Sequence, residues 1–201
     1  MTGAPRSGKT MIAGILKVCG VFTGETDKML ENVSVRDKVM GAHLRMIGAD
    51  PKGINPLPDR MPLATWDVGH HMEKEGYQDG AWMVKSSRIV PTWKVWQHNY
   101  PRARYVIVRR RTGDIISSCM KTAYMDAYKT QKGWKEMVLA YEAMFAQMIT
   151  ELDVKVVWPH RMAHGDYGQV YDMLDWLGLP WKIEVLQWAD PKFWKYRNKK
   201  R

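Results

Sequence analysis

The chain has 201 residues and a formal net charge of +10, from 31 lysines and arginines against 21 aspartates and glutamates. Its hydrophobic fraction of 45% is that of a globular protein and excludes a disordered chain. The charge suggests a polyanionic partner, such as a nucleotide, a nucleic acid or an acidic glycan, and a generally basic surface is the alternative. No long apolar run and no signal-peptide pattern is present, so we expect a cytoplasmic protein with no membrane partner.

The length suits a single domain, which we place over residues 1–194, with a basic tail over 195–201. The two cysteines, Cys19 and Cys119, lie in apolar helical contexts. We expect both to be buried free thiols, because two cysteines in such contexts do not make a disulfide framework.

The chain begins with a glycine-rich loop. Gly3, four further residues, Gly8, Lys9 and Thr10 match the phosphate-loop pattern G-x4-G-K-[ST]. Such a loop brings backbone amides close to phosphate oxygens, and the apolar helix predicted over 11–19 would add the positive end of its dipole. A phosphate loop normally follows a buried strand, and none precedes this one. Either the polypeptide starts further upstream or another segment fills that position.

Strands and helices are expected to alternate along the rest of the chain. Periodicity and turn residues predict helices over about 28–47, 90–98, 114–128, 135–152 and 167–177, and a loop over 50–58. The stretch 61–80 is ambiguous and is expected to hold a short polar helix. Strands are predicted over 81–85, 104–108 and 154–158. This alternation favours an α/β fold of three layers, in which helices flank a mainly parallel sheet that lacks its first strand.

A second group of polar residues follows the predicted strand 104–108. Arg110 stands at the end of that strand, Asp114 opens the next helix, and Ser118 lies one turn into it. Arg110 and Ser118 are therefore placed to converge on one phosphate, whose oxygens match the planar fork of arginine. The alternative is a solvated charge cluster that closes the strand.

Both groups resemble the nucleotide-binding motifs of sulfotransferases. Pro5-Arg6-Ser7-Gly8 is similar to the loop that binds the 5′-phosphosulfate in that family. Arg110, Asp114 and Ser118 take the positions of the 3′-phosphate motif R-x-P-x-D-x-x-x-S, with Thr112 where the family usually has proline.

Two further segments extend the resemblance over nearly the whole chain, in the same order. Residues 82–88, followed by Pro101-Arg102-Ala103-Arg104, resemble the W-x-x-K-D-P-R and P-x-A-R/K run of bacterial and viral sulfotransferase-like proteins, with Ser86-Ser87 in place of Asp-Pro. Residues 176–180 are similar to the closing helix of those proteins.

The resemblance implies a P-loop-containing sulfotransferase-like fold that binds 3′-phosphoadenosine-5′-phosphosulfate (PAPS) as sulfuryl donor. The residues that it assigns to the donor are Pro5, Arg6, Ser7, Gly8, Lys9 and Thr10 at the phosphosulfate, and Arg110 and Ser118 at the 3′-phosphate. Arg6 and Lys9 would neutralise charge on the leaving phosphate, with help from Lys85. The acceptor would be a hydroxyl or amine, for example on a carbohydrate.

An acceptor hydroxyl also needs a general base. Glu31 is our candidate, with His70 and His71 as rivals. The two adjacent histidines could also be metal ligands, but the sequence has no cysteines or carboxylates at the spacing that a metal site with them would need. We therefore expect no metal.

Two other function classes remain open. A P-loop kinase, which Lys9 favours, needs Mg²⁺ held by an aspartate at the end of a strand, and Asp67 is the one weak candidate. The chain could also bind a nucleotide or another polyanion without catalysis. Specific nucleic-acid binding is not expected, because the sequence contains no helix-turn-helix, zinc-finger or ribonucleoprotein pattern.

Overall fold

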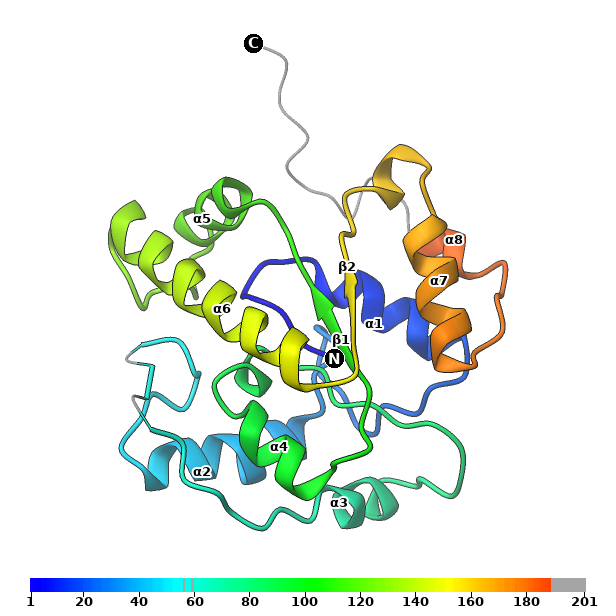
Figure 1. The fold of residues 1–201 in the computed structure, drawn as a ribbon, viewed down its shortest axis with the longest axis horizontal. Coiled ribbons are helices and arrows are strands. Elements are labelled where there is room, and N and C mark those ends of the chain that lie inside the picture. The colour runs from blue at the N-terminus through cyan, green and yellow to red at the C-terminus, as the bar shows by residue number, and fades with distance from the viewer. Residues whose placement is uncertain (56, 59, 189–201) are drawn as a thin grey trace.

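The protein has a mixed α/β fold built on a short parallel sheet (Figure 1). The computed structural model describes residues 1–55, 57–58 and 60–188. Strands β1 (Tyr105–Val108) and β2 (Val154–Val157) pair in parallel, with Tyr105 opposite Val154 and Val108 opposite Val157. Both are rich in β-branched residues, as the sequence predicts. The tail proposed over 195–201 lies outside the described residues.

The residues before the loop occupy the position that the sequence left without a strand. Thr2 forms a parallel bridge with Ile107 of β1, through two backbone hydrogen bonds of 2.8 Å. On the other side, the amino group of Met1 donates to the Val84 carbonyl at 2.8 Å, and the Ser86 amide donates to the Met1 carbonyl at 3.3 Å. In the described residues, the sheet thus has no regular strand before the loop, as expected, but the isolated bridge at Thr2 and the contacts of Met1 fill that position and anchor the loop.

The strand predicted over 81–85 is not regular. Within it, Trp82 forms an isolated parallel bridge with Phe22, and the segment beyond pairs with the first residue of the chain. The backbone is thus sheet-like at these contacts, but they are too few to make a continuous ladder.

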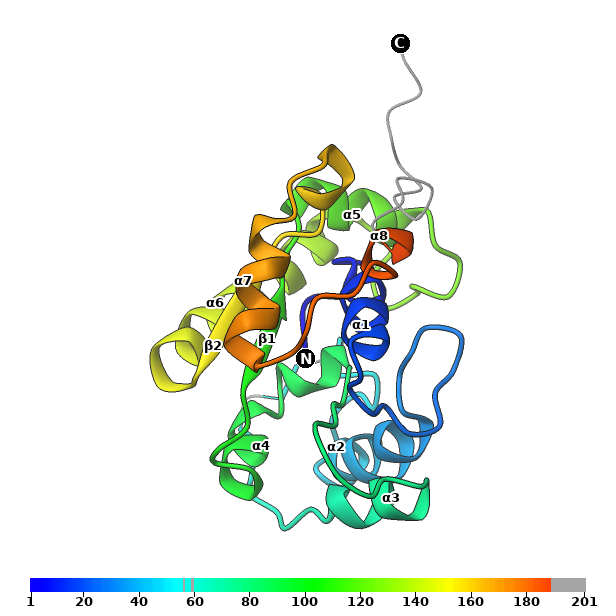
Figure 2. The ribbon, with the colours of Figure 1, turned by 90° about the vertical axis from the view of Figure 1, so that its right-hand side faces the viewer.

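Helices surround the strands on both sides (Figures 1 and 2). The helical elements are α1 (Lys9–Val18), a π-helical turn over Val35–Met40 continued by α2 (Gly41–Met46), α3 (Val68–Lys74), α4 (Trp93–Asn99), α5 (Thr112–Met120), α6 (Gln131–Glu151), α7 (Gly168–Leu177) and α8 (Val185–Trp188), with short 3-10 turns over Ser87–Ile89 and Met162–His164.

Two predicted helices are shorter than the sequence indicates. The helix expected over 28–47 begins only after a tight turn, in which Thr26 and Asn32 form an antiparallel bridge. The helix expected to reach residue 128 ends at Met120, and the Thr122 hydroxyl then donates to the Ser118 carbonyl at 2.7 Å. In both places polar side chains compete for the backbone groups that a helix would use.

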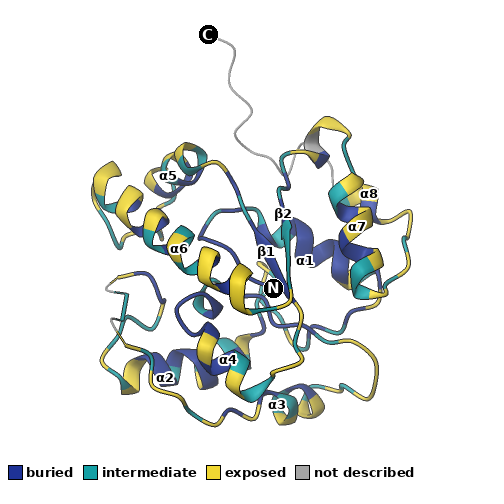
Figure 3. Ribbon diagram, viewed as in Figure 1, coloured by how far each residue is buried: buried dark blue, intermediate teal, exposed yellow. Residues whose placement is uncertain are grey.

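The core consists of two apolar clusters, one on each face of β1. Tyr105 and Ile107 pack into a cluster with α4, α5 and α6, whereas Val106 and Val108 pack against α1, α7 and α8. This division follows from the alternation of side chains along a strand. Figure 3 shows β1 and most of α1 as buried.

Both cysteines are buried and free, as predicted. Within the described ranges, no helix combines the length and apolar character needed to cross a membrane.

Candidate functional site

The glycine-rich loop connects the sheet-paired first residues to α1. The Ser7 amide donates to the Ala4 carbonyl at 3.2 Å, and Gly8 begins the helix with a left-handed φ of 97°. Gly3 passes so close to β1 that a Cβ there would lie 2.3 Å from the Val108 carbonyl oxygen. The Met11 amide donates to the Gly8 carbonyl at 3.0 Å, and the amides that precede it lie at the positive end of the helix dipole.

Arg6 links the loop to α5 and to the segment after it. Its backbone has a φ of 63°, and its Nε donates to Ser118 Oγ at 3.0 Å while its Nη1 donates to the Tyr124 hydroxyl at 2.8 Å. Arg110 Nη1 donates to the Arg6 carbonyl at 3.1 Å. Arg6 is 112 positions from Ser118 and 104 from Arg110, so the fold brings together the two segments that the sequence identified separately.

The arginine of the second motif precedes α5, its aspartate lies in the first turn of that helix, and its serine lies near the end of it. Arg110 is only 9% exposed, and its Nε lies 3.7 Å from a carboxylate oxygen of the half-exposed Asp114. Ser118, one turn further along α5, is buried. Asp114 therefore contacts the guanidinium group, while Ser118 contacts the loop.

Lys9 points beneath the loop. Its Nζ donates to the carbonyls of Gly3 at 3.0 Å and Ala4 at 2.7 Å and to Ser87 Oγ at 2.8 Å, and the residue is 6% exposed. Burial lowers the pKa of Lys9 from 10.5 to about 7, and repulsion by Lys85 adds to the shift. Lys9 thus joins the loop to the segment that contains Ser87, a contact that sequence reasoning missed.

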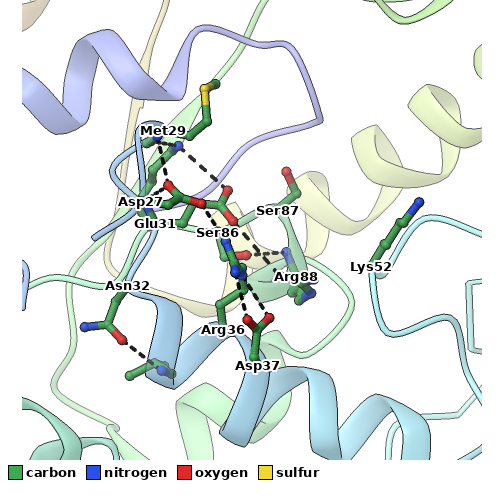
Figure 4. A network of polar contacts seen from close by, with 12 residues as sticks. Asp27, Met29, Glu31, Asn32, Arg36, Asp37, Lys52, Ser86, Ser87 and Arg88 are labelled. Atoms are coloured by element: carbon green, nitrogen blue, oxygen red, sulfur yellow. Dashed lines mark hydrogen bonds and ion pairs between the residues drawn. The ribbon is translucent and has the colours of Figure 1, made fainter. Parts of the chain in front are cut away.

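Lys85 is a second buried ammonium beside the loop, and its side chain is 3% exposed. Its Nζ donates to the Met29 carbonyl and, at 3.3 Å, to Thr10 Oγ1. The Glu31 carboxylate lies 3.7 Å from Lys85 and 4.0 Å from Arg88. Burial lowers the pKa of Lys85. Glu31, the proposed base, thus lies within 4.0 Å of two cations at the loop, and Figure 4 labels it together with Arg88.

A tight turn over residues 27–31 holds Met29 and Glu31 in these positions. One carboxylate oxygen of Asp27 accepts from the Met29 amide at 2.8 Å and the Glu31 amide at 3.1 Å, and the other lies 2.5 Å from Arg36 Nη1. Arg36 also forms two hydrogen bonds with Asp37, which lower the pKa of that carboxyl group (Figure 4). The sequence pattern missed this turn because its apolar spacing indicated a helix.

Positive charge exceeds negative charge in this region. The cations are Arg6, Lys9, Arg36, Lys85, Arg88 and Arg110, and the carboxylates that contact or face them are Asp27, Glu31, Asp37, Asp50 and Asp114. Several of these cations are largely buried, where an unbalanced charge is costly. A polyanion bound at the loop would relieve that cost, so the arrangement suits a ligand with several phosphate or sulfate groups.

The remaining candidates of the sequence lie elsewhere. His71 is on α3, with its Nδ1 2.7 Å from Ser34 Oγ, and α3 and α5 lie at opposite ends of the molecule (Figures 1 and 2). Asp67 caps the same helix by accepting from the His70 amide at 3.0 Å. Among the residues that the structure describes, no three histidines, cysteines or carboxylates are grouped so that they could hold a metal ion.

The geometry thus brings together the candidate residues of the loop, α5, Glu31 and Lys85, and leaves the histidines apart. Tyr124, the Met29 carbonyl with its turn, and the contact between Lys9 and Ser87 are parts of the site that no sequence motif indicated. Comparison of the chain with protein-family models, with curated proteins and with solved structures found no match. The function must therefore be inferred from the site.

Proposed function

We propose that this chain is a sulfotransferase with a three-layer, P-loop-type fold, and that it uses PAPS as its donor. In this proposal the loop over 5–10 binds the 5′-phosphosulfate, and Arg110 and Ser118 bind the 3′-phosphate. The observation that carries the proposal is the contact of the two segments: Arg6 donates to Ser118 at 3.0 Å, and Arg110 donates to the Arg6 carbonyl at 3.1 Å.

The proposed reaction follows from the charges around the loop. An acceptor hydroxyl or amine attacks the sulfur, the bond between sulfur and the phosphate oxygen breaks, and the 3′,5′-bisphosphate leaves with the bonding electrons. Glu31, whose side chain is 20% exposed, takes the acceptor proton. Arg6 and Lys85 stabilise the charge on the leaving phosphate, and Lys9 holds the loop in shape through its carbonyl contacts.

The position of Asp67 favours this proposal over a P-loop kinase. A kinase needs an aspartate near the loop threonine to hold Mg²⁺. Asp67, the weak candidate for that role, caps α3 instead. A protein that binds the nucleotide without catalysis would use the same contacts, and only turnover separates it from an enzyme.

Calorimetric titration with adenosine 3′,5′-bisphosphate, against ATP with Mg²⁺, tests the proposal. We expect the bisphosphate to bind and Arg110→Ala to weaken it by about tenfold or more, since a charge-assisted contact to phosphate is lost. Arg102→Ala removes the same charge from an exposed turn and should leave the affinity unchanged. Tight binding of ATP with Mg²⁺ alone would contradict the proposal. Transfer of labelled sulfate from PAPS to a panel of hydroxyl and amine acceptors then separates catalysis from binding.

A further inference from the structure

Residues 24–33 form a short hairpin, and a single carboxylate oxygen holds both of its arms. Thr26 on the first arm and Asn32 on the second form the antiparallel bridge. At the base of the hairpin, Glu75 Oε2 accepts from the Glu25 amide at 2.8 Å and from Asn32 Nδ2 at 2.5 Å. Because one donor belongs to each arm, the carboxylate closes the hairpin.

The contact between the carboxylate and the hairpin is tightly packed. Asn32 is only 2% exposed, and its side chain also donates to the Thr23 carbonyl at 3.3 Å and accepts from the Val35 amide at 2.8 Å. Gly24 has a φ of 64°, and a Cβ there would lie 2.1 Å from Glu75 Oε2. Buried polar groups are costly to leave unpaired, so this set of hydrogen bonds fixes the base of the hairpin.

The helix that precedes Glu75 is anchored in the core. Glu75 directly follows α3, in which Val68 and Met72 are fully buried. The Tyr100 hydroxyl accepts from the Val68 amide at 2.8 Å and so fixes the first turn of the helix. The carboxylate therefore projects from an element that does not depend on the hairpin for its position.

A second side chain of α3 contacts the residues just after the hairpin. His71 Nδ1 lies 2.7 Å from Ser34 Oγ. His71 and Glu75 are four positions apart, which places them on one side of the helix. The same side of α3 thus contacts the hairpin at its base and the chain directly beyond it.

The tip of the hairpin meets the phosphate loop (Figure 4). The Met29 carbonyl accepts from Lys85 Nζ and from the Thr10 hydroxyl, and the Glu31 carboxylate lies 3.7 Å from Lys85. Leu30, between the two, has a left-handed φ of 58°. Such a conformation is unfavourable for leucine and persists only where the surrounding structure holds it.

We infer that Glu75 is a positioning residue of the site. Together with His71 it ties the hairpin to α3, and so keeps the Met29 carbonyl and the proposed base Glu31 at the loop. The two side chains act through the backbone of the hairpin. The inference rests on the proposed function, because that function gives Glu31 and Lys85 their roles, and it adds the element that holds them in register.

Acetylation of lysines by acetic anhydride, measured for each residue by mass spectrometry, tests the inference without any ligand. Lys85 and Lys9 are 3% and 6% exposed, and both should react slowly in the wild type. In Glu75→Ala, Lys85 should react about tenfold or more faster, because the hairpin opens locally more often. Lys9 is held by carbonyls of its own loop and should stay protected.

Two control variants separate the hydrogen bonds from the charge. Glu75→Gln keeps an oxygen that can accept both bonds, so Lys85 should react as in the wild type. Glu73→Ala removes an exposed carboxylate from the same helix and should also behave as wild type. Equal acetylation of Lys85 in Glu75→Ala and wild type would overturn the inference, and so would a parallel rise at Lys9, which reports general loosening.

His71→Ala replaces Glu75→Ala if circular dichroism shows that the latter is unfolded. It removes one hydrogen bond from a half-buried side chain and leaves the carboxylate in place. Lys85 should then react severalfold faster while Lys9 stays protected. An unchanged rate at Lys85 in this folded variant would equally overturn the inference.

Titration with adenosine 3′,5′-bisphosphate links the inference to the proposed function. Glu75→Ala should bind the bisphosphate severalfold more weakly, because Lys85 is no longer held at the loop, and Glu75→Gln should bind it as the wild type does. Unchanged affinity in a folded Glu75→Ala variant would overturn the inference. If the wild type binds no bisphosphate at all, the proposed function fails, and the acetylation result still decides whether Glu75 positions the hairpin.

Discussion

Replacement of Lys9 by methionine should change how the stability of the protein depends on pH. The Lys9 ammonium is 6% exposed, and burial lowers its pKa from 10.5 to about 7. Between these two values the unfolded chain holds a proton that the folded protein has released. Because the unfolded state binds more protons, the free energy of unfolding rises with pH in this range. From pH 7 to pH 9 this contribution of Lys9 amounts to about 2 kcal/mol.

Urea unfolding of the wild type and of Lys9→Met at pH 7, 8 and 9 measures this effect. The free energy of unfolding of the wild type should rise by about 2 kcal/mol relative to that of the variant over this range. The variant also loses three hydrogen bonds, which lowers its stability by the same amount at every pH and leaves the pH-dependent difference intact. Lys17→Met, an exposed change on the same helix, should follow the wild type. The buried Met1 amino group, with a pKa of about 5, is common to all three chains and cancels. A constant difference between wild type and Lys9→Met at the three pH values would refute the reasoning.

Three further predictions concern the loop. Bisphosphate binding at pH 8 should take up protons, because a bound anion raises the lowered pKa of Lys9. Calorimetry in buffers of different ionisation enthalpy measures the uptake, and no uptake would contradict binding of the anion beside Lys9. Gly3→Ala should cost about 2 kcal/mol or more in urea unfolding, since its Cβ would lie 2.3 Å from a β1 carbonyl oxygen, whereas Gly113→Ala, with open space around it, should cost nothing. Tyr124→Phe should weaken bisphosphate binding severalfold at unchanged stability, because the exposed ring stays and only the hydrogen bond from the loop arginine is lost; unchanged affinity would show that this bond does not position the arginine.

The sequence alone determined the features that depend on residues close to one another in the chain. The spacing of Gly3, Gly8 and Lys9 predicted the loop and its helix, and the β-branched run before Arg110 predicted β1. The sequence also placed Arg110 between β1 and the next helix and Ser118 within that helix, where the structure has them. Local periodicity and turn chemistry carry this information because hydrogen bonds within a helix, and the alternation along a strand, involve neighbours in sequence.

Only the tertiary structure decided how these pieces meet. Met29 contributes its backbone carbonyl, which accepts from Lys85, 56 positions away in the chain. Because every residue has such a carbonyl, the sequence does not indicate which one lies in the site. The turn that presents it exists because Asp27 accepts two amides that the apolar pattern assigned to a helix. Lys9 turns inward to its own loop because Ser87 and two carbonyls are within reach there. Such contacts depend on distances across the fold, which no local pattern of residues specifies.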